Sequence, residues 1–187
     1  LFLLSLSIVS CDVNNELDAI PAEVAAEVAL NTDGLDFSRY ISIGTSLTAG
    51  FTDGALFKAA QENSFPNILA GKFGAEFKQP LMNDNIGGFV FNGNVVLNPR
   101  FYFDGAGPAV LPATPTTELT TILAGPFNNY GVPGLKSFHL GIPGYGALNP
   151  YFGRMASSPT ATIMGDALAQ NATFFTLDIG ANDVLFY

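Results

Sequence analysis

The sequence lacks tryptophan and contains one cysteine, Cys11, and one histidine, His139. A single cysteine excludes a disulfide within the chain. Basic residues are also scarce, because seven lysines and arginines stand against 16 acidic residues and leave a net charge of -9. Binding to nucleic acid or to anionic lipid needs a basic surface, so this charge argues against both partners. We expect the acidity to serve solubility.

Apolar material is abundant in the 187 residues, since 48% are hydrophobic and only 12% are charged. This length and composition suit one domain with a sizeable core. The 20 glycines and 12 prolines predict many turns and long ordered loops.

Residues 1–9 form an apolar stretch with interspersed serines. It is shorter than the roughly 20 residues that span a bilayer as a helix, but it fits the hydrophobic region of a secretory signal. No basic residue or initiator Met precedes it, so we expect that the start of the natural chain is missing. Ile8-Val9-Ser10-Cys11 resembles a bacterial lipobox.

We therefore expect residues 1–11 to be a truncated lipoprotein signal and Cys11 to carry lipid. The protein would then be anchored in a bacterial cell envelope, at the outer membrane or cell surface. The alternative is an ordinary signal peptide with a chance cysteine. Residues 12–36 read as a tether with a short helix over 21–30, which would be either a spacer or a helix packed on the domain.

The rest of the chain alternates strand and helix patterns, which favours an α/β domain over residues 37–187. The expected strands are 37–44 and 173–179. The expected helices are 55–62, 65–77 (capped by Ser64, with Phe65, Ile68, Leu69 and Phe73 on one face), 116–123 and 160–170. The expected irregular parts are a loop at 45–54, a hairpin or insertion at 86–115 with a proline-rich loop at 108–115, and a loop at 128–134.

Each of the segments 41–47 and 177–183 begins with an apolar run that ends on a glycine, and small polar side chains follow that glycine. Buried parallel strands deliver chemistry to their carboxyl ends in this way. Ser46 is a candidate nucleophile, and Asn182 is a candidate donor to an oxyanion. Gly134 is a third candidate, because glycine allows its amide a close approach to a bound oxygen.

Each candidate also has a structural interpretation: a helix cap or turn for Ser46, a plain turn for Gly134, and a loop tie for Asn182. Solvated or capping roles are expected for the neighbouring Asp178 and Asp183, since no further carboxylate cluster partners them in a metal site.

Taken together, these segments resemble the SGNH, or GDSL, hydrolase family. Gly44-Thr45-Ser46-Leu47 is similar to its first block, Gly134 to its second, and Gly180-Ala181-Asn182-Asp183 to its Gly-x-Asn-Asp block. The resemblance implies a flavodoxin-like three-layer α/β/α fold with a parallel sheet, and hydrolysis of carboxylic esters in lipids, acylated sugars or small molecules. It implies that Ser46 is the nucleophile and that Ser46, Gly134 and Asn182 form the oxyanion hole, without metal or organic cofactor.

The chain departs from the family pattern at two places. Thr45 replaces the usual Asp, and the Asp-x-x-His block that supplies the catalytic base is absent. His139 has Lys136 where the Asp belongs, so we expect His139 to be a loop or surface residue. We therefore expect a fragment, incomplete at its C-terminus and lacking a base for Ser46.

Two alternatives stay open. The first is a lipoprotein binding module that kept the fold and lost catalysis. The second, a Rossmann-like nucleotide binder, is weaker because Gly144-Tyr145-Gly146 lacks the third glycine of its motif. The α/β-hydrolase motif Gly-x-Ser-x-Gly is not met around Ser46, where Thr48 takes the last position.

Overall fold

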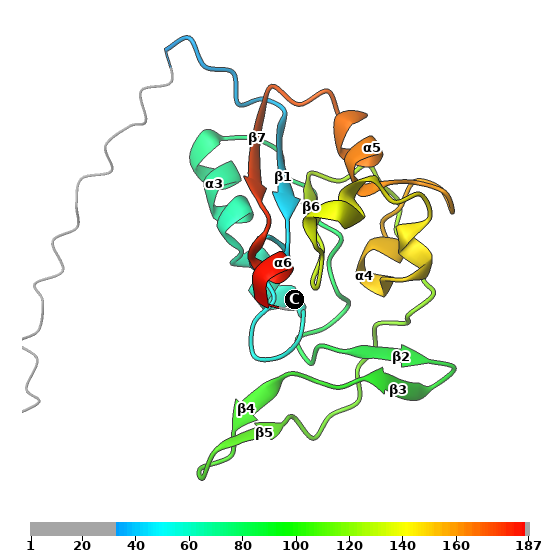
Figure 1. Cartoon of the computed structure of the whole chain (residues 1–187). Helices are drawn as coiled ribbons and strands as arrows, with labels where there is room; N and C mark the ends of the chain where they lie inside the picture. The colour runs from blue at the N-terminus through cyan, green and yellow to red at the C-terminus, as the bar shows by residue number, and fades with distance from the viewer. Residues whose placement is uncertain (1–32, 186–187) are drawn as a thin grey trace, which may run out of the picture. The chain divides into compact units, whose positions relative to one another are not determined.

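The computed structural model describes residues 33–185. The expected signal peptide with Cys11, most of the expected tether and the helix expected at 21–30 lie outside these residues. The described part is a mixed α/β structure that contains a three-stranded parallel sheet and several short helices (Figure 1). The α/β class and the parallel sheet predicted from the sequence are therefore confirmed.

The sheet has the strand order β6-β1-β7, with β1 (Tyr40–Gly44) in the centre, β6 (Asn129–Gly131) on one side and β7 (Phe174–Asp178) on the other. Gly44, the last residue of β1, is the register partner of both Gly131 and Asp178. All five residues of β1 are buried, as expected for a central parallel strand. The three strands therefore end together along one edge.

The predicted strands at 37–44 and 173–179 are present with narrower bounds, but the loop predicted at 128–134 contains β6. This prediction was wrong because Asn-Tyr-Gly is short, shows no alternation and is rich in turn-forming residues. The segment is extended because its backbone pairs with β1, which is a tertiary effect.

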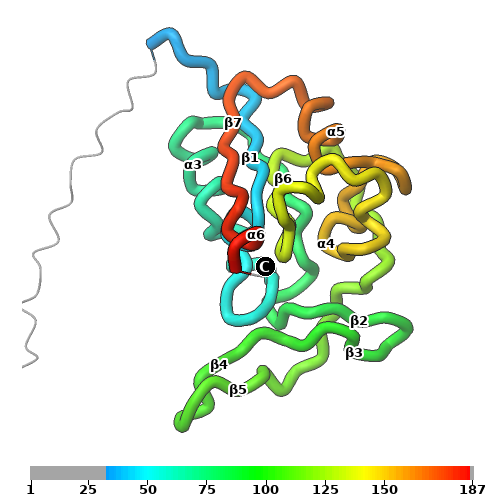
Figure 2. Tube along the Cα trace, in the orientation of Figure 1, coloured from blue at the N-terminus to red at the C-terminus, as the bar shows by residue number. Residues whose placement is uncertain are grey.

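Helices cover both faces of the sheet. On one face α3 (Phe65–Phe73) places the Phe73 ring edge-on against Tyr40 and Phe174, with centroids 5.4 and 5.5 Å apart. On the other face Ile41 and Ile43 pack into a buried cluster. Its other members come from β6 and the residues on either side of it, from the short helices and loops of residues 145–155, and from α5 (Ile163–Leu168): Phe127, Tyr130, Val132, Leu135, Tyr145, Phe152, Met155, Ile163 and Ala167. Figure 2 shows α3 and α5 on opposite sides of the strands.

The prediction for α3 was correct in its start and only partly correct in the face that it assigned. Leu69 and Phe73 are half-buried, and Phe73 packs on the sheet, but Phe65 and Ile68 are exposed, while Pro66 and Ala70 are buried. The helix ends at Gly74 in the left-handed conformation, with φ +66°, so residues 75–77 are not helical. Ser64 does occupy the N-cap position, but its hydroxyl donates to Gln79 instead of capping the helix.

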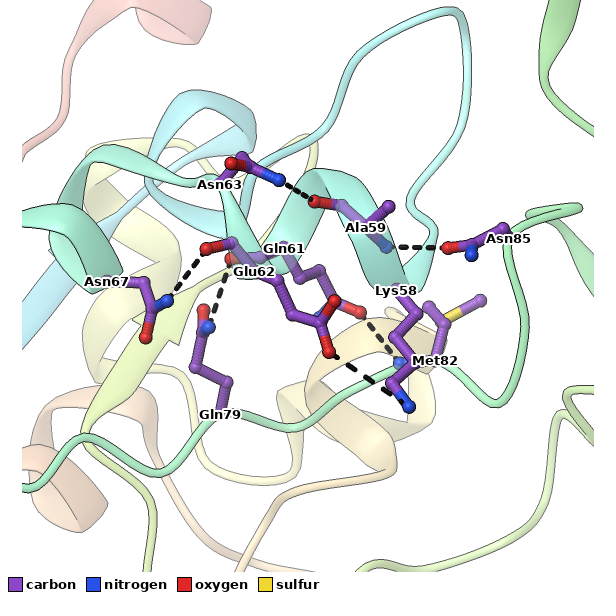
Figure 3. A network of polar contacts seen from close by, with 9 residues as sticks. All are labelled: Lys58, Ala59, Gln61, Glu62, Asn63, Asn67, Gln79, Met82 and Asn85. Carbon is purple, nitrogen blue, oxygen red and sulfur yellow. Dashed lines mark hydrogen bonds and ion pairs between the residues drawn. The ribbon is translucent and has the colours of Figure 1, made fainter.

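A buried glutamine fixes the corner between α2 (Lys58–Glu62) and the segment that follows α3 (Figure 3). The Gln61 side chain donates to the Pro80 carbonyl at 3.1 Å and accepts from the Met82 amide at 2.7 Å. The Gln79 side chain donates to the Gln61 carbonyl at 3.0 Å. Each polar atom of a buried side chain needs such a partner, so Gln61 determines the path of residues 79–82.

Residues 86–115, expected to be a hairpin or an irregular insertion, form two hairpins. They are β2 (Phe89–Phe91) with β3 (Asn94–Leu97), and β4 (Phe101–Phe103) with β5 (Pro108–Val110). The first part of the predicted proline-rich loop is thus strand β5. The helix predicted at 116–123 is absent from the structure because this segment pairs with Val90 around a parallel bridge from Val90 to Glu118. The Val90 amide donates to the Thr117 carbonyl, and the Leu119 amide donates to the Val90 carbonyl.

The remaining elements are short. They comprise α1 (Ser46–Ala49), α4 (Pro150–Gly153), α6 (Ala181–Leu185) and the 3-10 helices η1 (Ser137–Gly141) and η2 (Tyr145–Ala147). The segment 45–54, expected to be a loop, thus begins with the one-turn helix α1. The helix predicted at 160–170 is α5, which Thr162 caps by accepting from the Gly165 amide. Within residues 33–185, no helix has the length and apolar character needed to cross a bilayer.

Candidate functional site

The three residues singled out in the sequence follow the three strands of the sheet at one edge. Gly131, Gly44 and Asp178 lie side by side in one row at this edge as register partners. Ser46 follows Gly44 by two residues, Gly134 follows Gly131 by three, and Asn182 follows Asp178 by four. A trans chain advances at most 3.8 Å per residue, so each lies within about 15 Å of chain from that row. The topology therefore brings together the ends of segments that are far apart in the sequence.

Ser46 is the first residue of α1, which packs tightly on this edge. A Cβ at Gly44 would lie 2.9 Å from the Thr48 Cβ, and a Cβ at Gly131 would lie 2.6 Å from the Thr48 carbonyl carbon. Only glycine at both strand ends allows the helix to sit so close. The Ser46 side chain is partly exposed, and neither its hydroxyl nor its amide hydrogen-bonds to any residue that the structure describes.

Gly134 lies on an exposed turn after β6, with φ +78°. The Val132 amide donates to the Gly44 carbonyl at 2.9 Å, and the Leu135 amide donates to the Val132 carbonyl at 3.1 Å. These bonds shape the turn around Gly134. Among residues 33–185 the amide of Gly134 has no acceptor, so it is available to a bound molecule.

Asn182 lies in the first turn of α6, and only 6% of its surface is exposed. Its side-chain nitrogen donates to the Leu135 carbonyl oxygen at 2.9 Å. The amide nitrogen carries two hydrogens, and the second has no acceptor in the described part of the chain. Asn182 therefore ties the Gly134 turn in place and keeps a second donor.

Asp183, the next residue of α6, binds the same loop. Its carboxylate accepts from the Ser137 hydroxyl at 2.6 Å and from the Ser137 amide at 3.0 and 3.1 Å. The bond from the Ser137 hydroxyl, followed by that from the amide, lowers the pKa of Asp183 below its ordinary value. Asp183 thus acts as a fixed anion that orients residues 134–137.

Asp178, at the end of β7, makes a long contact of 3.4 Å with the hydroxyl of buried Thr48. This contact links β7 to α1, the helix that carries Ser46. Residues 33–185 contain no group of three or more His, Cys, Asp or Glu side chains placed to hold a metal ion.

His139 differs from the loop or surface residue that we expected. It lies half-buried in η1, and its ring stacks on Tyr145 with centroids 4.6 Å apart. Its Nδ1 accepts a hydrogen bond of 3.1 Å from the Lys136 amide. Burial lowers the pKa of His139, Lys136 lowers it further, and Asp183 opposes the shift.

The neutral imidazole in this arrangement carries its proton on Nε2, because Nδ1 is the acceptor. An Nε2 that already bears a proton cannot take one from a serine. The observed hydrogen bonding therefore orients η1 and does not present His139 as a general base.

Sequence reasoning missed the groups that hold the candidates in place. These are the Leu135 carbonyl, Ser137 and Thr48. No spacing or composition signal marks them, because each acts through a contact between segments that are distant in the sequence.

Comparison of the chain with protein-family models, with curated proteins and with solved structures gives no match.

Proposed function

We propose that this protein is a serine hydrolase of the SGNH type that cleaves carboxylic esters at the carboxyl edge of its sheet. The observation that supports this most is the convergence of Ser46, Gly134 and Asn182 at the ends of three adjacent parallel strands. Two amides that have no acceptor among residues 33–185, and one buried carboxamide with a hydrogen that has none there either, are the donor types that stabilise an oxyanion.

In the proposed reaction the Ser46 hydroxyl attacks the ester carbonyl carbon and passes its proton to a general base, a role that the family resemblance gives to a histidine of an Asp-x-x-His block and that residues 33–185 do not fill. The carbonyl oxygen becomes an oxyanion, which the Ser46 and Gly134 amides and the Asn182 side chain stabilise. Collapse of the intermediate expels the alcohol, and the same base returns the serine proton to the departing alcohol oxygen. Water then releases the acid from Ser46. Removing one oxyanion donor typically lowers turnover by about 10²–10³-fold, so Asn182→Ala should fall in that range.

A second function, a binding module with the same edge, is favoured by the state of His139. The sole histidine of the chain already accepts a hydrogen bond at Nδ1, so residues 33–185 offer Ser46 no imidazole base. In that case the donors would bind a carboxylate or carbonyl oxygen without turnover.

The two functions are separated by a fluorophosphonate probe together with a short-chain p-nitrophenyl ester. The protein expressed from its full reading frame should label and hydrolyse the ester, Ser46→Ala should do neither, and Ser158→Ala, at an exposed serine away from the edge, should match the parent. Equal turnover by Ser46→Ala and the parent would dismiss the hydrolase. Absence of labelling in the parent would leave the binding module.

We also propose that Cys11 anchors the protein by lipid to a bacterial envelope. The lipobox-like run before it is the support. Expression of Cys11→Ala in a bacterial host should move the protein from the membrane fraction to the soluble fraction, and unchanged partitioning would refute the anchor.

A further inference from the structure

The two hairpins expose a large number of apolar side chains. Phe103 is 73% exposed and Val96 is 46% exposed, where a folded domain normally buries most such groups. The exposed group on these strands, called here the hairpin surface, consists of Phe91, Val95, Val96, Leu97, Phe101, Phe103 and Val110. Contiguous apolar patches of this kind usually mark an interaction site.

The hairpin surface is not confined to one face. Val95 and Val96 are consecutive residues of β3, so their side chains point to opposite faces of the ribbon. Both are nevertheless exposed, at 44% and 46%. A rigid partner that docks on one face would leave the other in water, whereas a fluid apolar phase contacts both.

The segment is also nearly free of charge. Residues 86–117 contain two formal charges, Arg100 and Asp104, although the whole chain carries -9. Arg100 donates to the Asn85 and Phe101 carbonyls and lies over the Phe57 ring at 5.1 Å. The Asp104 carboxylate accepts from the amides of Ala106 and Gly107 within its own turn.

The Arg100 charge is thus engaged within the protein, whereas Asp104 lies exposed in the turn between β4 and β5 and keeps its negative charge. The hairpin surface therefore offers a protein partner a single carboxylate beside its apolar side chains. Protein interfaces normally add a polar rim to their apolar centre. A neutral apolar phase requires neither charge nor rim.

The hairpins extend from the edge of the sheet that carries the candidate site. The Phe101 amide donates to the Asp53 carbonyl at 2.7 Å, and Asp53 lies in the loop that leaves α1. Figure 1 shows both hairpins on the side of the sheet at which β1 ends. An object that covers the hairpin surface therefore lies on the same side as Ser46.

We propose that the hairpin surface docks on a neutral lipid surface, namely the interface of a zwitterionic phospholipid membrane. The apolar side chains enter the interface from both faces of the ribbon. The backbone stays at the level of the head groups, because the open edges of two-stranded ribbons cannot lose their water in hydrocarbon. This contact is separate from any lipid on Cys11.

The lack of tryptophan in the chain provides a local test. The full 187-residue chain carrying Phe103→Trp is mixed with phosphatidylcholine vesicles and its emission is recorded. We expect a shift to shorter wavelength, and quenching when the vesicles contain brominated phosphatidylcholine. The matched control is Leu168→Trp, since Leu168 is 67% exposed on α5 and should show neither effect.

A second measurement is cosedimentation with the same vesicles. The double variant Val96→Ser/Phe103→Ser should reduce the partition coefficient at least about tenfold, because each side chain loses apolar area worth about a factor of ten. Ile68→Ser/Leu168→Ser, which removes two exposed apolar side chains from helices, should not. Added salt should have no effect on either, since no charge drives the binding.

Three outcomes would overturn the proposal. The first is that the emission of Phe103→Trp stays unchanged although the chain sediments with vesicles. The second is that vesicles shift the emission of Leu168→Trp as much as that of Phe103→Trp. The third is that the emission of Phe103→Trp shifts with protein concentration before lipid is added. The last result would show that a second copy covers the hairpins.

The docking does not depend on hydrolysis. Ser46→Ala in the Phe103→Trp background should keep the spectral shift, so failure of the docking proposal is distinguishable from failure of the proposed hydrolase function.

Discussion

The side-chain nitrogen of Asn182 donates a hydrogen bond of 2.9 Å to the carbonyl oxygen of Leu135. This bond joins the helix after β7 to the turn after β6, across the end of β1. Asp183 adds a second tie through Ser137. The conformation of the Gly134 turn therefore depends on a helix nearly fifty residues further along the chain.

Removing the Asn182 amide should destabilise the fold. Asn182→Ala leaves the Leu135 carbonyl without its partner, and an unsatisfied buried group costs about 1–3 kcal/mol. Urea unfolding should show this loss in the free energy of unfolding. Asn94→Ala, which removes an exposed amide, is the control and should change it by less than about 0.5 kcal/mol. A loss no larger than the control would show that the bond does not support the turn.

A methyl group at the end of β6 should be poorly tolerated. The Cβ in Gly131→Ala would lie 2.7 Å from the Ala49 Cα, so α1 must move or the strand must bend. Overpacking of this kind costs about 1–3 kcal/mol, and thermal unfolding should show it. Gly141→Ala is the matched control because nothing lies within 4 Å of the position that its methyl group would take. Equal melting temperatures would mean that α1 is not packed against β6.

The effect of the Ser137 hydroxyl on the pKa of Asp183 should be measurable by titration. The hydrogen bonds from Ser137 lower the pKa of this carboxyl, so Ser137→Ala should raise it towards the ordinary value. The contribution of the tie to stability is present above the unfolded-state pKa and is lost as pH falls through the lower folded-state pKa. Carboxyl carbon shifts in an NMR titration report the value. An unchanged pKa in Ser137→Ala would contradict the assigned cause.

Gln61 should contribute more to stability than other polar residues near it. Gln61→Ala leaves the Met82 amide and the Pro80 carbonyl without their side-chain partner, so we expect a loss of at least about 2 kcal/mol. Asn67→Ala removes one bond to the Glu62 carbonyl nearer the surface and should cost about 1 kcal/mol or less. Chemical denaturation compares the two variants. The reverse order would show that water replaces Gln61 without cost.

Among the elements, the sequence predicted best those whose pattern is local. The strands β1 and β7 are mostly apolar and end at or near a glycine, and α5 begins after a capping threonine. The helix expected at 116–123 and the loop expected at 128–134 were wrong. In both segments the backbone follows partners elsewhere, Val90 in one and β1 in the other, which no local propensity encodes.

The same division applies to the candidate site. Residue type and spacing singled out Ser46 and Asn182, because an apolar run that ends on a glycine and is followed by a small polar residue is a pattern of the chain itself. Gly134 was singled out because a glycine in a turn allows its amide a close approach to a bound oxygen. That their strands are neighbours, that Asn182 holds Leu135, and that Nδ1 of His139 is occupied came only from the tertiary structure. Hydrogen bonds and close packing between distant segments depend on where the chain returns to itself, and local sequence carries no measure of that.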